Sequence, residues 1–307
     1  MRLNRLDLNL LVALDALLTE RSITRAAERI NLSQPATSGA LARLREYFGD
    51  ELLVRVGAQM KPTPLGESLA TPVHNILMQI QATVERGVQF DAAQSDRKFR
   101  LLMSDYTATT LMAMVIRRLA DIAPNMRIEI LAPIVGPADE LEQGRIDFII
   151  MPVYALSPNH PSQILFEEQF ACIGCKKNDK LKKGMTLEAF MDLGHVTVRF
   201  GANRARTQDQ ELLQSVYGLE PRIEIIAATF NAIPQYLPGT RRIATVYQHL
   251  ADTWARYLPL KVVPLPVDLK PVPWGIQWHQ YRDLDPGIQW MRDLIIEVAR
   301  ENYTTSQ

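Results

Sequence analysis

The sequence predicts a helical N-terminal domain followed by a larger α/β region with room for two lobes. Three observations support this fold class. The chain has 307 residues, and at roughly 150 residues per domain this favours more than one domain. Apolar side chains in residues 1–90 recur every three or four positions, as in amphipathic helices. From residue 98 onward, strand-like segments alternate with helical ones, which favours a largely parallel sheet with helices on its faces.

The composition is that of a globular protein with balanced charge. Hydrophobic residues make up 47% and charged residues 22%, which excludes a disordered or collagenous chain. Lys plus Arg and Asp plus Glu both number 34, but residues 1–66 hold nine basic side chains against seven acidic ones. The N-terminal part is therefore slightly basic and the remainder slightly acidic.

The sequence lacks signals for export or membrane insertion. Two cysteines do not form a disulfide framework and fit a reducing compartment. No segment approaches the ~18 consecutive apolar residues of a membrane helix, and the apolar run after Arg5 has no small-residue cleavage site. We expect a soluble, cytoplasmic protein with no membrane partner.

Residues 8–48 predict three consecutive helices. Leucines form an apolar stripe over residues 8–20, and Ser22 is placed to cap a second helix after it. After a turn, Ser33 is placed to cap a third helix that runs to Phe48, with Pro35 in its first turn. The side chains of this third helix expected in the core are Ala36, Ala40, Leu41 and Leu44.

A short hairpin and a long helix are expected next. Residues 52–61 alternate weakly around Gly57, as in two short strands, and Thr63 with Pro64 begins a fourth helix by the cap-plus-proline rule. Four apolar residues of that helix, spaced four, three and four apart, form a short coiled-coil seam that favours pairing with a second copy. These dimerisation residues are Leu69, Val73, Ile76 and Ile80, and residues 90–97 read as a linker.

The remaining chain predicts nine strands and at least three helices. The strands are expected at residues 99–103, 126–131, 147–151, 171–175, 195–200, 223–227, 243–247, 260–265 and 274–278. The helices are expected at residues 109–122, 208–217 and 286–301.

Two helices separated by a tight turn, within about 25 residues, match the helix-turn-helix geometry that places a second helix in the major groove of DNA. Gln34 can pair with adenine and Arg43 with guanine, and Arg55 and Lys61 on the hairpin suit a wing that contacts phosphate or the minor groove. An ordinary helical bundle with a polar surface remains an alternative from periodicity alone.

Several motifs, taken in order, resemble one family. These are Leu6-Asp7-Leu8-Asn9-Leu10-Leu11, Ser22-Ile23-Thr24-Arg25-Ala26-Ala27, Leu32-Ser33-Gln34-Pro35-Ala36-Thr37-Ser38, Asp50-Glu51-Leu52-Leu53-Val54-Arg55 and Pro62-Thr63-Pro64-Leu65-Gly66. They resemble the LysR-type transcriptional regulators in order and spacing. Downstream, Gly144-Arg145-Ile146-Asp147, Cys172-Ile173-Gly174-Cys175 and Gln289-Trp290-Met291-Arg292 resemble the NodD-like branch, whose members answer aromatic inducers.

The resemblance implies an N-terminal all-α winged helix-turn-helix with a long linker helix, followed by an α/β two-lobed effector domain like the type 2 periplasmic binding proteins. The implied boundaries are 1–66 for DNA binding, 67–97 for the linker and hinge, and 98–307 for the effector domain. Lobe I would comprise 98–165 and 267–307, and lobe II 166–266. The DNA-binding residues expected are Arg25, Ser33, Gln34, Pro35, Thr37, Ser38, Arg43, Arg45, Arg55 and Lys61.

An inducer site is expected between the lobes, because ligands of open α/β sheets bind beyond the carboxyl ends of the strands. This rule selects Ser104, Asp105, Thr107, Pro152, Phe200, Asn203, Arg204, Thr229, Phe230, Asn231 and His279. The implied partners are double-stranded promoter DNA, a small aromatic inducer, RNA polymerase and further copies in a homodimer or homotetramer. The family pattern suggests a transcription activator.

Two other functions stay open at this point. Cys172 and Cys175 have thiol-redox spacing, so a redox-responsive or ligand-independent regulator is possible, although side chains three apart on a strand point to opposite faces. An enzyme or solute-binding protein on the same fold is the less favoured alternative. The five histidines lie apart in the sequence and no phosphate-binding loop is present, so we expect no catalytic residues, metal or cofactor.

Overall fold

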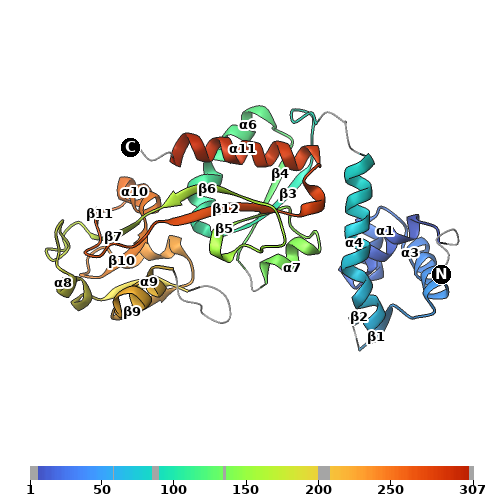
Figure 1. The fold of residues 1–307 in the computed structure, drawn as a ribbon, viewed down its shortest axis with the longest axis horizontal. Helices are drawn as coiled ribbons and strands as arrows, with labels where there is room; N and C mark the ends of the chain where they lie inside the picture. The colour runs from blue at the N-terminus through green and yellow to red at the C-terminus, as the bar shows by residue number, and fades with distance from the viewer. Residues whose placement is uncertain (1–5, 58, 85–89, 134–135, 200–207, 304–307) are drawn as a thin grey trace. The chain divides into compact units, whose positions relative to one another are not determined.

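The computed structural model describes residues 6–57, 59–84, 90–133, 136–199 and 208–303. The chain forms two compact units, one centred on the N-terminal helices and the other on the two sheets that follow (Figure 1).

The three N-terminal helices begin and end where the sequence predicts. They are α1 (Asn9–Glu20), α2 (Ile23–Arg29) and α3 (Gln34–Phe48). Ser22 accepts a hydrogen bond from the Arg25 N–H at 3.4 Å, and Ser33 accepts one from the Ala36 N–H at 3.3 Å. Both predicted caps are confirmed, and each satisfies a backbone donor that a helix start otherwise leaves unpaired.

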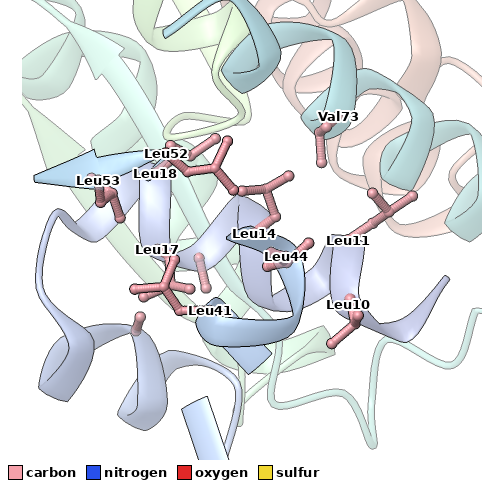
Figure 2. Packing of buried hydrophobic residues seen from close by; sticks show 12 residues of the cluster. Leu10, Leu11, Leu14, Leu17, Leu18, Leu41, Leu44, Leu52, Leu53 and Val73 are labelled. Carbon is pink, nitrogen blue, oxygen red and sulfur yellow. The ribbon is translucent and has the colours of Figure 1, made fainter. Parts of the chain in front are cut away.

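Leucines from separate elements meet in one core (Figure 2). On α1, Leu10, Leu14 and Leu17 recur at helical spacing and turn one face inward, while Leu41 and Leu44 supply the facing side of α3. Ala36 is exposed and Ala40 half-buried, so the prediction that both are in the core is wrong for Ala36.

The predicted hairpin consists of β1 (Leu53–Val56) and β2 (Gln59–Pro62), which pair antiparallel. Its base is fixed by Asp50, whose Oδ1 accepts hydrogen bonds from the Thr63 hydroxyl and the Leu52 N–H, both at 2.6 Å. The Thr63 bond, and then the Leu52 bond, lower the pKa of Asp50. This carboxylate therefore ties the start of the hairpin to its end.

Helix α4 (Pro64–Val84) is the long helix that Thr63 and Pro64 predict, and Pro72 lies within it. Its apolar stripe divides into two parts. Val73 is buried in the leucine core and Leu69 packs against that core. Ile76 and Ile80 remain 46% and 44% exposed.

The first large sheet has the strand order β4-β3-β5-β12-β6. Strands β3 (Lys98–Met103), β4 (Arg127–Leu131) and β5 (Phe148–Pro152) are parallel. Strand β12 (Val272–Trp278) runs antiparallel to both β5 and β6 (Ser162–Glu168). The sheet is mixed, so the expectation of a largely parallel sheet holds for only part of it.

The second large sheet has the strand order β11-β7-β10-β8-β9. Strand β8 (His195–Val198) runs parallel to β9 (Ile223–Ala227) and β10 (Ile243–Tyr247), whereas β7 (Phe170–Cys175) pairs antiparallel with β10 and β11 (Leu260–Val263). Glu168 ends β6 and Phe170 begins β7, so one residue separates the two sheets along the chain.

Helices cover these sheets. In Figure 1, the C-terminal helix α11 (Pro286–Tyr303) runs beside α6 (Ala113–Ile122), and Arg118 of α6 pairs with Glu297 and Glu301 of α11 at 2.7 and 2.9 Å. The other helical elements are α5 (Asp105–Thr107), the π-helical η2 (Ala108–Met112), α7 (Pro137–Glu142), η3 (Val153–Ala155), α8 (Leu187–Asp192), α9 (Gln208–Tyr217), η4 (Phe230–Tyr236), α10 (Gln248–Tyr257) and η5 (Gln280–Arg282).

Below, lobe I denotes the first large sheet with α5, η2, α6 and α11. Lobe II denotes the second large sheet with α8, α9, η4 and α10.

Candidate functional site

The start of α3 presents polar side chains to solvent. Ser33, Gln34, Pro35 and Ser38 are all exposed, and the leucines Leu41 and Leu44 further along α3 hold the helix on the core. A rigid helix start with exposed amide and hydroxyl groups can read base edges in a groove. The structure thus brings together four of the residues predicted to contact DNA.

The side chain of Thr37 is buried, unlike those of its neighbours Ala36 and Ser38. The sequence places it on the exposed start of α3, but its side chain is fully buried and its hydroxyl donates to the Ser33 carbonyl oxygen at 3.1 Å. The reason is its position one turn before Leu41, on the face of α3 that packs inward. A DNA contact by Thr37 stays a prediction.

Two further exposed arginines lie on α2 and on the second half of α3. Arg43 on α3 is 61% exposed and pairs with Asp7 at 3.2 Å, and Arg25 on α2 is 62% exposed and pairs with Glu20 at 3.5 Å. The pKa of Asp7 is lowered, first by the backbone N–H of Asn9 and then by Arg43. Exposed ion pairs of this kind are weak, so both guanidinium groups can exchange their carboxylate for a DNA phosphate or base.

The hairpin carries the predicted wing residues. Arg55 and Lys61 are exposed, and the Arg55 Nε donates to the Gly57 carbonyl at 3.3 Å across the turn. Arg45 instead supports the hairpin from α3, because its guanidinium donates to the carbonyls of Glu51 and Leu53 at 2.9 and 2.8 Å. A direct DNA contact by Arg45 stays a prediction.

In the effector region, Asp105 of lobe I contacts lobe II. Its carboxylate accepts hydrogen bonds from two consecutive backbone N–H groups at the start of η4, Phe230 at 3.2 Å and Asn231 at 2.7 Å. The Asn231 side-chain amide donates to the Thr109 hydroxyl at 2.8 Å. The strand-end rule therefore brings Asp105, Phe230 and Asn231 together.

A buried carboxylate lies beside this contact, where the two lobes join. Glu168, at the end of β6, has no exposed surface, and it accepts hydrogen bonds from the Tyr106 hydroxyl and from His249 Nδ1 at 2.9 Å. The hydrogen bond that His249 donates to Glu168 raises the pKa of His249, and burial raises the pKa of Tyr106 well above its usual value. Tyr106 of lobe I and His249 of lobe II thus both donate to the same carboxylate, His249 also through its backbone N–H at 3.4 Å.

Aromatic rings surround Tyr106. Its ring centroid lies 4.6 Å from Tyr247, 5.0 Å from Trp274 and 6.2 Å from Phe230. Tyr247 and Phe230 belong to lobe II, whereas Trp274 belongs to lobe I. Edge-to-face and tilted rings of this kind contribute about 0.5–1.5 kcal/mol per pair beyond their burial.

The remaining predicted effector residues are distributed more widely. Ser104 and Thr107 are buried, and their hydroxyl oxygens lie 3.3 Å apart. Pro152 is buried at the end of β5, and Thr229 is exposed immediately before η4. Phe200, Asn203 and Arg204 lie outside the described residues.

His279 does not join this group. Trp278, the residue before it, pairs with Phe148 at the start of β5, whereas Asp105 follows the end of β3, which is parallel to β5. His279 therefore follows the opposite edge of the sheet, where its buried ring accepts a hydrogen bond from the Tyr281 N–H at 3.1 Å. The strand-end prediction for His279 is wrong, because β12 runs antiparallel to β5.

Sequence reasoning did not select several residues of the lobe junction, namely Tyr106, Thr109, Glu168, Tyr247, His249 and Trp274. Tyr106 directly follows a selected residue, so a wider window after β3 would have included it. Glu168 has no comparable signal, because β6 also contains Ser162, Gln163 and Glu167 and the residue type alone does not distinguish Glu168 from Glu167.

A hollow of about 320 Å³ lies where the chain crosses between the lobes. Its lining combines apolar side chains with a few polar ones, among them Phe170, Leu265, Gln169, Gln248 and Asp268. Within the parts of the chain that the structure describes, no helix has both the length and the apolar character to cross a membrane.

A helix-turn-helix domain joined in one chain to a two-lobed α/β domain defines a DNA-binding regulator that is controlled by a ligand. Family comparison agrees with this class. Residues 8–67 match the bacterial regulatory helix-turn-helix protein of the lysR family, and residues 92–300 match the LysR substrate binding domain. The chain belongs to the LysR family, and it is a DNA-binding transcriptional regulator with an effector-binding domain.

Similar proteins include nodulation regulators along their whole length. Nodulation protein D 2 of Rhizobium tropici is 43% identical over 300 residues, covering 97% of this chain and 95% of that protein. Nodulation protein D 1 of Bradyrhizobium elkanii is 41% identical with the same coverage. The similarity spans both the DNA-binding and the effector regions.

Solved structures of the same fold include a full-length OxyR variant from Pseudomonas aeruginosa, with a TM-score of 0.72, 18% identity, and coverage of 98% of this chain and 99% of that chain. A probable transcriptional regulator from Pseudomonas aeruginosa has a TM-score of 0.68 and 29% identity, covering 95% of this chain and 97% of that chain. Full-length CbnR in complex with its target DNA has a TM-score of 0.53 and 16% identity, covering 96% of this chain and all of that chain.

Proposed function

We propose that the protein activates transcription from a promoter in response to a small aromatic inducer held between lobe I and lobe II. The observation that carries this proposal is the junction of aromatic and polar groups from both lobes, formed by Asp105, Tyr106, Phe230 and Tyr247. Small-molecule sites combine apolar walls with a few fixed polar groups in this way. The identity of 41–43% to nodulation regulators supports an aromatic inducer.

For DNA binding, we propose that the start of α3 enters the major groove. Gln34 and Ser38 read base edges, Arg43 leaves Asp7 to reach a base or phosphate, and Arg55 and Lys61 contact the backbone beside the groove. The exposure of these side chains supports the assignment. CbnR, which shares the fold and was solved in complex with its target DNA, supports the same role for this domain.

We further propose a division into a DNA-binding domain over residues 1–66, a linker helix and hinge over residues 67–97, and an effector domain over residues 98–307. Copies pair through the exposed stripe of α4 that includes Ile76 and Ile80, and the dimers form tetramers on DNA at the nucleoid. The inducer binds one arrangement of subunits better than another, and this shift permits contact with RNA polymerase. No catalytic step is part of the proposal.

Footprinting on the DNA upstream of the gene tests the function. Purified protein is added with and without a panel of flavonoids, phenols and benzoates, and we expect a protected region whose boundary changes with at least one compound. Gln34→Ala should weaken binding to this site by about 1–3 kcal/mol, whereas Arg55→Ala should weaken binding to all sequences alike.

Each result bears on a separate part of the proposal. Protection that no compound in the panel alters would contradict the aromatic inducer but not the regulator. Unchanged discrimination between operator and random DNA in Gln34→Ala would contradict the assignment of α3 as the recognition helix.

A further inference from the structure

The two lobes are connected by more than the chain crossings between them. Asp105 sits at the start of α5 in lobe I, and both of its carboxylate oxygens are used by lobe II, Oδ1 by Phe230 N–H and Oδ2 by Asn231 N–H. Asn231 returns a bond from its side chain to Thr109 of lobe I. These three hydrogen bonds join residues that are more than 120 positions apart in the sequence.

We propose that Asp105 and Asn231 are positioning residues that lock lobe I and lobe II in one relative orientation and so set the affinity for the inducer. The part about affinity rests on the proposed function, whereas the orientation of the lobes does not.

The geometry favours a specific lock over an incidental contact. A carboxylate that takes two consecutive N–H groups fixes both the distance and the direction of η4 relative to α5, because the two oxygens are held in one plane. Bonds to an ionised acceptor are also roughly twice as strong as neutral ones. Asp105 is only half-buried, so the bonds can open without burying an unpaired charge.

The neighbouring residue Tyr106 also holds α5 against η4. Tyr106, next to Asp105, places its ring 6.2 Å from the ring of Phe230, the residue whose N–H Asp105 accepts. Tyr106 also donates to Glu168 at the lobe junction, so α5 is held at the point from which Asp105 reaches across. One short helix therefore carries both the polar and the aromatic contact to η4.

The consequence for binding follows from population arithmetic. An inducer that touches both lobes binds only the fraction of molecules whose lobes are correctly oriented, and its apparent dissociation constant rises as that fraction falls. A lock formed within the protein keeps the fraction high before the inducer arrives.

Distance measurements between the lobes in the full-length protein test the lock without any inducer. Spin labels are attached to a genetically encoded ketone amino acid at Asp121 on α6 and at Glu188 on α8, both exposed, which leaves the two cysteines unlabelled. Singly labelled proteins supply the distances between subunits. We expect one narrow distance in the wild type and a second, separate population in Asp105→Ala.

Two milder variants keep the test valid if Asp105→Ala does not fold. Asp105→Asn keeps the size of the side chain but can accept from only one of the two N–H groups, and Asn231→Ala removes only the bond to Thr109. The second population should decrease in the order Asp105→Ala, Asp105→Asn, Asn231→Ala. Asp252→Ala is the matched control, because that carboxylate bonds Gln248 within α10 of lobe II.

Distributions identical to the wild type in all three variants would overturn the lock, as would an equal change in Asp252→Ala. If the footprinting identifies an inducer, its dissociation constant should rise roughly tenfold in Asp105→Ala, as expected when the competent fraction falls by that factor. If none is identified, the distance measurement still decides whether the lock exists.

Discussion

The DNA-binding region and the effector region reach their functional geometry in opposite ways. In the first, side chains act on neighbours in sequence, as when Ser33 caps α3 three residues later and Arg45 holds Leu53. In the second, the candidate site consists of pairs far apart in the chain, such as Tyr106 with Glu168 and Asp105 with Asn231. The first site is therefore encoded in local motifs and the second in the packing of two lobes.

This difference also appears in how each region is stabilised. The helices of the first region enclose a core of aliphatic side chains, in which Leu14, Leu17 and Leu44 are completely buried. The lobe junction instead buries a carboxylate, Glu168, together with hydroxyl and imidazole partners. Substitutions in the first region should mainly change stability, whereas those in the second should also change the relation between the lobes.

The largest expected effect is that of Leu14→Ala in the leucine core. Removing a fully buried leucine side chain leaves a cavity and should lower the free energy of unfolding of the DNA-binding region by about 2–5 kcal/mol. Urea denaturation of the full chain, followed by helical circular dichroism, measures the loss. Leu32→Ala, at a side chain that is 49% exposed, is the control and should change the free energy by no more than about 0.5 kcal/mol.

The helical boundaries could be predicted because they depend on local capping chemistry. Ser22, Ser33 and Thr63 each lie where a helix start needs an acceptor, and α2, α3 and α4 begin there. Which face of a helix is buried depends instead on contacts with elements that are distant in the sequence. Thr37 is buried and Ala36 exposed because the inward face is set by the direction from which α1 packs on α3.

The effector site could be predicted only in part, for a related reason. The strand-end rule selects Asp105 and Phe230 but does not predict the hydrogen bond between them. It misplaces His279, because the direction of β12 depends on pairing with β5 and β6 across more than a hundred residues. The sequence does not single out Glu168, because its role depends on two hydrogen-bond partners, Tyr106 and His249, that belong to other elements.

A smaller effect is expected from Tyr106→Phe at the lobe junction. The ring and its aromatic neighbours are kept, but the hydroxyl that donates to the buried Glu168 is lost. Leaving a buried acceptor with one donor fewer costs about 1–3 kcal/mol. Differential scanning calorimetry should show the loss in the transition of the effector region, with the transition of the DNA-binding region unchanged. A shift of both transitions would contradict the separation drawn between the two regions.

A still smaller effect is expected on stability when the pH is changed, because His249 titrates at the lobe junction. Hydrogen bonding to Glu168 raises the pKa of His249 above its ordinary value of 6.5, so the folded state binds this proton more tightly than the unfolded state. The stabilisation is therefore fully present below pH 6.5 and is lost as the pH rises through the higher folded value. His249 is 40% exposed, and after screening by solvent the effect should be about 0.2–1 kcal/mol.

The melting temperature of the effector region between pH 6 and pH 8 measures this effect. It should fall with rising pH in the wild type and fall less in His249→Gln, which keeps a polar side chain but cannot titrate. A steeper fall in the variant than in the wild type would show that the proton is bound elsewhere.

The smallest effect is expected at the two cysteines, and it decides between inducer and redox control. Both are free thiols on β7, three residues apart and thus on opposite faces of the strand. Burial raises the pKa of Cys172, whereas the Gly239 N–H that donates to the Cys175 sulfur lowers the pKa of Cys175. Both thiols are buried, so iodoacetamide should modify them slowly, and Cys175 before Cys172, because the thiolate is the reactive form.

Cys175→Ser tests whether this thiol controls DNA binding. The variant should change operator affinity less than about twofold, with or without peroxide, because a serine hydroxyl can accept the same Gly239 N–H and the strand lies outside the DNA-binding region. A peroxide-dependent footprint in the wild type that disappears in Cys175→Ser would instead make this strand, and not the lobe junction, the sensor of the effector region.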